Sequence, residues 1–235
     1  EVIAKRLARS GIWSRREAER LIEAGRVSVD GKILDTAAVR VTNRSEITVD
    51  DKPLTLESVP RIWIYYKPKN ELVTRDDPTN RRTVYETIEE NHPDFSKLPR
   101  LINIGRLDFK SEGILLFTNI GVVANFMENP KSDIKRTYRV YVSGEISDEM
   151  LTMLSKGVKV NGFQYKPIEA KSSSANGQTV LDLTLTEGKN REIREIFDFF
   201  GIAVHRLVRM SFGPFKAWGL QPKQFVEFPI PSELR

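Results

Sequence analysis

The sequence contains no cysteine and only two histidines, His92 and His205, among its 235 residues. A disulfide framework and a thiolate metal site are therefore excluded, and a histidine-based metal site or a Ser-His-Asp triad has little support. No apolar run approaches the roughly 18 residues that a membrane-spanning helix needs. The residue types left for chemistry are Asp, Glu, Lys, Arg and Tyr. We accordingly expect no metal, no cofactor and no membrane partner.

The chain is modestly basic, with a formal net charge of +5 and an isoelectric point of about 9.3. Lysine and arginine neutralise phosphates, so this balance suits a nucleic-acid partner. Many proteins that bind no nucleic acid are equally basic. The arrangement of the charges therefore carries more information than their sum.

Residues 2–50 combine a short helix pair with a small sheet. Ser14 is expected to cap the second helix with Glu17 as its capping-box partner, and Asp30-Gly31 predicts a hairpin turn. A further strand is predicted over Val39–Val41. The polar helix faces carry many basic side chains, which a solvated surface explains as well as an RNA-binding one does.

The polar stretch 50–60 is interrupted by Pro53 and Pro60. Residues 54–61 are expected to link a small domain over residues 1–53 to a larger one over residues 62–235. The larger domain alternates many strands with single helices in no regular order. This pattern indicates an α+β fold with a mainly antiparallel sheet.

Several elements of the larger domain can be placed from the pattern of apolar residues. Ile114–Phe117 predicts a buried strand, and Tyr165–Lys171 predicts another. Lys135–Gly144 predicts a half-buried strand, but its alternation leaves open which face Tyr138 takes. Glu192–Phe200 predicts a helix that Gly201 ends.

The stretch Asn103–Asn119 holds the most chemical information. Gly105 and Gly113 permit tight backbone geometry, and between them Asp108 stands at the entry to a buried strand. Such a turn is a suitable mount for a fixed nucleophile, because rigid scaffolds present reactive groups on loops. Taken alone, the same residues fit a salt-bridged turn that caps a strand.

The run Ser14-Arg15-Arg16-Glu17-Ala18-Glu19-Arg20-Leu21-Ile22, followed by Gly25–Gly31, resembles the small S-four-type RNA-binding domain. The resemblance implies a small α/β domain whose two helices present basic residues to RNA phosphates. Such contacts position RNA without reading its sequence. The contacts that it implies are Arg15, Arg16, Arg20 and Arg26.

Three blocks in the larger domain resemble, in order, the pseudouridine synthases, in the subfamily that modifies ribosomal RNA and carries an S-four-type leader. The blocks are Tyr66-Lys67-Pro68, Gly105–Asn119 and Glu187–Arg194. Lys135–Val140 and Leu207–Pro214 support them. The resemblance spans nearly the whole chain, and it implies a catalytic domain on a mainly antiparallel mixed sheet with flanking helices.

The resemblance also implies roles for individual residues. Asp108 would be the catalytic aspartate, and Tyr138 would stack on the target base and assist its deprotonation. Arg194 would pair with Asp108, a bidentate contact that favours the ionised carboxylate. Charge alone makes further cations candidates for RNA contacts. The candidates to hold flanking phosphates are Lys67, Lys189, Arg191, Arg206 and Arg209, and Arg106 is the candidate to fill the space that the target base vacates. For each of these cations a solvated surface charge is an equal alternative.

Four departures from the family pattern lie in or near these blocks. Asn70 stands where glycine is usual after Lys-Pro-x, and Ile120 replaces the usual acidic residue before Gly121. Glu192 replaces the commoner glutamine, and Glu195 follows Arg194 where a second basic residue is frequent. None of them touches Asp108. They weaken the assignment of a particular target uridine.

The sequence thus predicts a monomeric, cytoplasmic enzyme without a cofactor that isomerises uridine to pseudouridine in ribosomal RNA or a ribosome assembly intermediate. Large-subunit RNA is the first expectation. Small-subunit RNA, or a non-catalytic RNA-binding assembly factor of the same fold, is the alternative. Whether Asp108 attacks the sugar or the base stays open at this stage.

Overall fold

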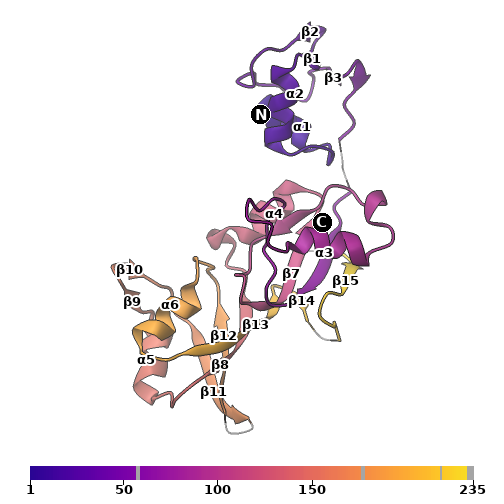
Figure 1. Cartoon of the computed structure of the whole chain (residues 1–235). Helices are drawn as coiled ribbons and strands as arrows, with labels where there is room; N and C mark the ends of the chain where they lie inside the picture. The colour runs from indigo at the N-terminus through magenta and orange to yellow at the C-terminus, as the bar shows by residue number, and fades with distance from the viewer. Residues whose placement is uncertain (57–58, 176–177, 218, 232–235) are drawn as a thin grey trace.

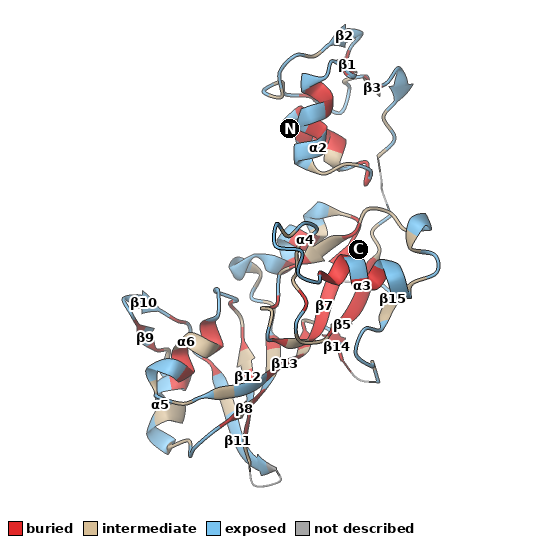
Figure 2. Ribbon diagram, viewed as in Figure 1, coloured by how far each residue is buried: buried red, intermediate tan, exposed pale blue. Residues whose placement is uncertain are grey.

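The computed structural model describes residues 1–56, 59–175, 178–217 and 219–231 of the chain. A small N-terminal part stands at one end of a larger part that contains most of the strands (Figure 1). Buried side chains gather inside each part, so each has a core of its own (Figure 2). None of the helices within these ranges combines the length and the apolar character needed to cross a membrane.

The small part packs two helices against a sheet with the strand order β2-β1-β3-β4. The helices are α1 (Ile3–Ala8) and α2 (Arg15–Glu23), and the strands are β1 (Val27–Val29), β2 (Lys32–Ile33), β3 (Ile47–Val49) and β4 (Lys52–Pro53). The capping box of Ser14 and Glu17 is confirmed at the start of α2. The hairpin turn at Asp30-Gly31 is confirmed between β1 and β2.

The strand expected over Val39–Val41 is wrong. Only Arg40 forms a ladder pair, with Val2, and helix α1 begins at the residue after Val2. The helix draws the chain away from the ladder. A single residue pair is therefore all that forms.

The larger part is built on one nine-stranded sheet. Its main path runs β11-β12-β8-β13-β7-β5-β15, while β14 pairs with β13 and β6 pairs with β7. The bounds are β5 (Ile62–Lys67), β6 (Ile102–Ile104), β7 (Glu112–Thr118), β8 (Arg136–Val142), β11 (Glu169–Ala175), β12 (Gln178–Leu185), β13 (Val204–Phe212), β14 (Phe215–Lys216) and β15 (Phe225–Phe228). Among the strands that the structure describes, β7 and β13 are the only pair that runs in parallel, which confirms a mainly antiparallel mixed sheet.

Helices and a hairpin complete the larger part. They are α3 (Val84–Asn91), α4 (Gly121–Glu128), α5 (Asp148–Lys156), α6 (Glu192–Phe199), the short 3-10 helices η1 (Phe95–Lys97) and η2 (Pro130–Ser132), and the hairpin β9 (Lys159–Val160) and β10 (Phe163–Gln164). The α5 and α6 helices pack on the half of the sheet that contains β8 and β12, and α3 packs on the half that contains β5 and β7. The helix predicted over Glu192–Phe200 is confirmed to within one residue, and Gly201 follows it with a φ of +70°.

The single strand expected over Tyr165–Lys171 is wrong. The chain forms β10 before Tyr165 and β11 only from Glu169. Between them the N–H of Ile168 donates to the carbonyl of Leu154 over 2.8 Å, so this segment folds back over α5. Pro167 has no N–H to continue a ladder, which explains the break.

Arg100 joins the larger part to the small one. Its N–H donates to the carbonyl oxygen of Gly11 over 3.2 Å, and its Nε lies 3.7 Å from Oε2 of Glu17. Since Glu17 is also the capping-box residue of α2, the contact ties the start of that helix to the larger part.

Candidate active site

Asp108 lies on the turn between β6 and β7, beside the parallel strand pair at the centre of the sheet. The N–H of Ser111 donates to the carbonyl of Asp108 over 3.0 Å and closes the turn. Gly113 has a φ of +103°, and a Cβ atom there would lie 2.2 Å from the carbonyl oxygen of Arg209. Only glycine lets β7 approach β13 so closely. The buried strand expected behind Asp108 is confirmed as β7.

Lys67 holds this turn and does not face solvent. Its side chain is 0% exposed, and its Nζ donates to the carbonyls of Pro68, Asp108 and Ser111 over 3.0, 3.1 and 2.9 Å. Burial lowers the pKa of this ammonium to about 8. The structure corrects the expectation that Lys67 binds an RNA phosphate, because the turn uses all three of its donors.

Asn70 occupies the position where the family usually has glycine. Its φ is +65°, a left-handed conformation that glycine adopts freely and asparagine tolerates. Its N–H donates to the carbonyl of Phe109 over 2.7 Å, and its Oδ1 accepts from Nζ of Lys110 over 3.1 Å. The substitution therefore keeps the required backbone and adds a side-chain tie to the Asp108 turn.

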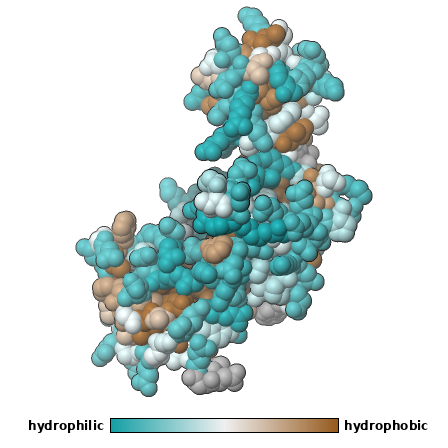
Figure 3. Space-filling model, viewed as in Figure 1, coloured by the Kyte–Doolittle hydropathy of each residue, from teal (hydrophilic) through white to brown (hydrophobic). Residues whose placement is uncertain are grey.

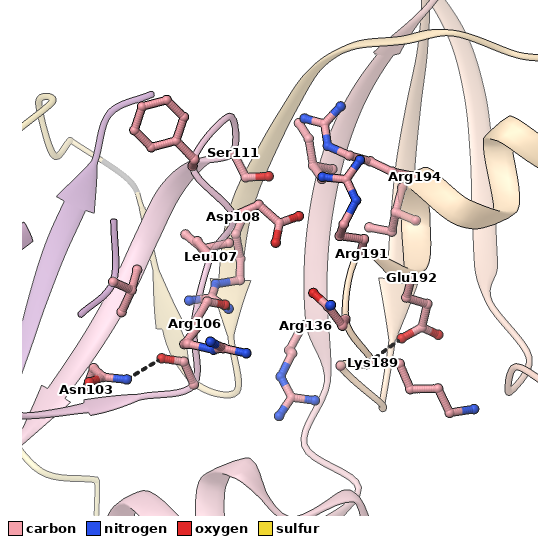
Figure 4. Close-up of a pocket in the computed structure, with 18 of the residues that line it drawn as sticks. Asn103, Arg106, Leu107, Asp108, Ser111, Arg136, Lys189, Arg191, Glu192 and Arg194 are labelled. Atoms are coloured by element: carbon pink, nitrogen blue, oxygen red, sulfur yellow. Dashed lines mark hydrogen bonds between the residues drawn. The ribbon is translucent and has the colours of Figure 1, made fainter. Parts of the chain in front are cut away.

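A cavity of about 910 Å³ opens in front of the turn (Figure 4). Asp108, Tyr138 and Arg194 all line it. The carboxylate of Asp108 faces Arg191 and Arg194 across the cavity, and it makes no hydrogen bond or ion pair within the described ranges (Figure 4). The interpretation as a salt-bridged turn is therefore wrong. The carboxylate is available to a ligand.

Arg194 lies on α6 and comes to the cavity from the side opposite Asp108. Its Nη1 donates to the carbonyl of Val204 over 3.2 Å, and its Nε is buried without a partner. Burial and the charge of Arg191 lower the pKa of Arg194, while the charge of Asp108 opposes them. The expected bidentate pair with Asp108 is not formed, since Val204 holds the guanidinium on its own side. The two groups act on each other through space.

Tyr138 lies on β8, with Leu183 and Arg209 as its neighbours on β12 and β13. The pairing of β8 with β12 is regular, so Tyr138 takes the same face as Val140. Its half-buried ring packs against the cores of both halves of the sheet and lines the cavity. The ring is thus on the wall where a base would enter.

Lys189 and Arg191 precede α6 at the cavity rim, and both are exposed. Nζ of Lys189 donates to the carbonyl of Gln164 over 2.6 Å and lies 3.1 Å from Oε2 of Glu187. Nε of Arg191 lies 3.8 Å from Oε1 of Glu195. These are surface contacts that a phosphate can replace.

Two carboxyl groups, Glu187 and Glu192, meet beneath this segment. Glu192 is 4% exposed; its Oε2 accepts from the N–H of Lys189 over 3.0 Å, and its Oε1 has no partner. Burial first, then the charge of Glu187 and a hydrogen bond to it, raise the pKa of Glu192 to about 8. Burial pushes the pKa of Glu187 upward, but the N–H of Lys166 and other donors lower it overall. Glu192 therefore keeps its proton to a higher pH than an exposed glutamate does, and in its protonated form it offers a donor and an acceptor as glutamine would.

Arg106 and Arg209 differ in accessibility. Arg106 is exposed, lines the cavity and makes no ion pair within the described part of the chain. Arg209 is 2% exposed and donates to the carbonyls of Ile114 and Arg106 over 2.8 and 3.4 Å. The structure corrects the expectation that Arg209 holds a flanking phosphate, because its side chain is buried and committed to the backbone.

The arginines of the small part fall into two groups. Arg15, Arg16 and Arg20 are exposed on α2 and form no ion pair within the ranges that the structure covers. Arg26 instead makes a bidentate pair with Asp50, with contacts of 2.8 and 2.5 Å. The surface of this part is largely hydrophilic on the face drawn in Figure 3. The first three cations are free to meet phosphates.

Ser111 and Arg136 are cavity residues that the sequence analysis did not predict. Ser111 is 1% exposed and has an unpartnered hydroxyl, and Arg136 is 6% exposed and donates to the carbonyl of Met127 over 3.2 Å. Ser111 and Arg136 both lie inside the motif blocks that carry the family resemblance. The sequence could not identify them as cavity residues, because nothing in it marks a serine or an arginine as buried. Among the described residues, no group of three metal-binding side chains occurs.

Comparison with known proteins agrees with this fold. The profile of the RNA pseudouridylate synthase family matches residues 61–198, and that of the S4 domain matches residues 3–55. An uncharacterized RNA pseudouridine synthase of Rickettsia felis is 40% identical over 226 residues, covering 96% of this chain and 95% of the relative. Ribosomal large subunit pseudouridine synthase B of Escherichia coli O157:H7 is 40% identical over 220 residues, covering 91% and 74%.

A solved structure described as a pseudouridylate synthase has the same fold, with a TM-score of 0.67, 24% identity and coverage of 99% of this chain and 97% of that one. The chain belongs to the RNA pseudouridylate synthase family and carries an S4 domain at its N-terminus. It is an isomerase that acts on RNA and converts uridine to pseudouridine.

Proposed function

We propose that this enzyme modifies a uridine of large-subunit ribosomal RNA, with Asp108 as the nucleophile. A relative that is named for the large subunit, at 40% identity over 91% of the chain, supports this choice of RNA. The observation that carries the assignment of the nucleophile is the unpaired carboxylate of Asp108 in a cavity lined by cations. The cavity volume of about 910 Å³ suits a nucleotide, since ligand sites span about 300–1,000 Å³.

The isomerisation sets the tasks for the catalytic residues. The bond between C1′ of the ribose and N1 of uracil breaks, the base turns, C1′ joins C5, and the proton of C5 leaves while N1 gains one. The carboxylate of Asp108 attacks C1′ as N1 leaves, or adds to the base, and in either case the bond that it forms breaks again before the product is released. Arg194 favours its ionised form through space. The ring of Tyr138 stacks on the base, a contact worth about 1–3 kcal/mol, and its phenol assists removal of the proton.

The target uridine has to leave its helix or loop to reach this cavity, at a cost of a few kcal/mol. Contacts to flanking phosphates offset part of that cost. We assign these to Lys189 and Arg191 at the cavity rim, with Arg106 in the space that the base vacates. A more distant part of the RNA binds the small domain through Arg15, Arg16 and Arg20. Arg26 can join them only when its ion pair with Asp50 breaks.

The layout that we propose is a small RNA-binding domain over residues 1–53, a linker over residues 54–61 and a catalytic domain over residues 62–235. The catalytic residues come from one chain, so a monomer suffices. Free ribosomal RNA or an assembly intermediate is the substrate. Because the proposed substrate is ribosomal RNA, we expect the enzyme to act in the cytoplasm.

Tritium release from RNA labelled at C5 of uridine tests this proposal. Large-subunit RNA should release tritium, and small-subunit RNA should not. Asp108→Asn should abolish release, because an amide is a poor nucleophile and carries no charge. Asp198→Asn, an exposed aspartate on α6, is the matched control and should behave as the parent.

Each part of the proposal has an outcome that refutes it. Undiminished release by Asp108→Asn would refute the nucleophile. Release from small-subunit RNA alone would move the substrate to that subunit. Mapping pseudouridines in cells with and without the protein would then identify the modified position.

A further inference from the structure

The hydroxyl group of Ser111 is buried in the wall of the active-site cavity without a partner. The residue is 1% exposed, it lines the cavity, and its Oγ makes no hydrogen bond within the described ranges. In Figure 4 the hydroxyl of Ser111 and the carboxylate of Asp108 project from the same turn into the cavity. Buried hydroxyls are normally hydrogen-bonded, so an unpaired one at a cavity wall indicates a ligand.

Arg209 also lines the cavity and carries a second buried donor that is unpartnered within the described residues. Its Nε and Nη1 donate to the carbonyls of Ile114 and Arg106, and its guanidinium lies 5.1 Å from the ring centroid of Phe212. The remaining nitrogen, Nη2, is buried and has no partner in the described part of the chain. Because two backbone acceptors and one ring fix the guanidinium plane, the direction of this donor is fixed as well.

The parallel pairing of β7 with β13 brings these two donors to one wall. Arg209 is the Cα partner of Gly113, two residues after Ser111. The backbone of Ser111 is itself held, since its carbonyl accepts from Nζ of Lys67 over 2.9 Å. Both donors are therefore positioned by the scaffold before any ligand arrives.

Building on the proposed function of Asp108, we propose that Ser111 Oγ and Arg209 Nη2 bind the carbonyl oxygens of the target uracil. Once the bond from C1′ to N1 is broken, a base that is not itself bonded to Asp108 is kept in the cavity by noncovalent contacts alone. Uracil offers two carbonyl acceptors, and the cavity offers two unpaired donors beside the nucleophile. Cytosine carries an amino donor in place of one carbonyl, which a guanidinium N–H cannot accept. The pair therefore also selects uracil against cytosine.

The two donors differ in a way that suits a base that turns. Arg209 is fixed in direction and acts as an anchor. The hydroxyl of Ser111 rotates about its Cβ–Oγ bond and can follow a carbonyl as C5 replaces N1 opposite C1′. The same reasoning makes Ser111 a substrate-binding residue whose contribution is largest after the bond has broken.

Ser111→Ala tests the inference, with Ser211→Ala as the matched control. Ser111 has no hydrogen bond to lose, so its removal should leave Tm and KM unchanged and lower kcat for tritium release by about 10-fold or more. Ser111→Thr should restore kcat, since it restores the hydroxyl. The hydroxyl of Ser211 bonds to that of Thr137 over 2.6 Å, so Ser211→Ala should lower Tm and keep the parental kcat.

The outcomes separate this inference from the function on which it rests. A parental kcat in Ser111→Ala, together with an active parent and an inactive Asp108→Asn, overturns the inference alone. A fall in kcat that is accompanied by a fall in Tm, and that Ser111→Thr does not restore, also overturns it. An inactive parent on every ribosomal RNA refutes both.

Discussion

The Nζ atom of Lys67 lies 3.1 Å from the backbone carbonyl oxygen of Asp108. The same ammonium also binds the carbonyls of Pro68 and Ser111, so one buried cation holds the turn that carries the carboxylate. The position of Asp108 thus depends on a lysine that is buried in the fold. Lys67 and Arg209 come from two different motif blocks, and both donate hydrogen bonds to backbone carbonyls.

Lys67→Met should lower both stability and activity. It leaves three buried carbonyls without their donor, at a cost of about 2–4 kcal/mol in the free energy of unfolding. A misplaced Asp108 should lower kcat by about 100-fold. Denaturant unfolding and tritium release measure the two effects.

Lys69→Met is the control for Lys67→Met. Lys69 is partly exposed and lies 3.4 Å from Glu112, so its loss should change stability by less than about 0.5 kcal/mol. A Lys67→Met enzyme with parental kcat would show that the buried ammonium does not position the turn.

Substitutions at Asn70 should follow backbone conformation rather than size. With a φ of +65°, Asn70→Gly should keep the parental stability and kcat to within about twofold. Asn70→Val places a β-branched residue in the left-handed region and should cost about 1–3 kcal/mol of unfolding free energy. Thermal unfolding compares the pair. Equal stability of the two variants would contradict the conformational explanation.

Glu192→Gln should flatten the pH dependence of stability. In the unfolded chain Glu192 releases its proton near its ordinary pKa of 4.5, and in the folded protein its pKa is raised to about 8. Between these values the folded state keeps a proton that the unfolded state releases. The contribution of Glu192 to stability is therefore full below pH 4.5 and is lost as the pH rises through about 8.

Thermal unfolding between pH 5 and 9 checks this window. The Glu192→Gln protein cannot lose the proton, so above pH 8 its Tm should exceed that of the parent by at least about 3 °C. Glu195→Gln, on the same helix but partly exposed, should follow the parental curve. Parallel Tm curves for Glu192→Gln and the parent would contradict the raised pKa of Glu192.

Replacing Arg15, Arg16 and Arg20 together by alanine should weaken RNA binding and its dependence on salt. Losing three phosphate contacts should reduce the slope of log K against log salt by about 2. Arg26→Ala is the control, and its effect should be smaller because Asp50 already holds that guanidinium. An unchanged slope in the triple variant would refute the role of α2.

The sequence by itself determined the local elements and the family. The capping box of Ser14 and Glu17, the hairpin at Asp30-Gly31 and the helix ended by Gly201 each follow from side chains that act within a few residues. The order of the motif blocks identified the family and predicted Asp108 as the catalytic aspartate. Local pattern failed at Val39–Val41, where the partner strand ends at once because helix α1 begins.

The tertiary structure alone decided which charged side chains are exposed and which are buried. Lys67 and Arg209 look like Lys189 and Arg191 in sequence, since each is a cation inside a motif. Their burial follows from the parallel approach of β7 to β13 at Gly113, a contact between residues far apart in the chain. Burial withdraws water, so buried donors turn to backbone carbonyls while exposed ones stay free for phosphate. No local pattern records that partition.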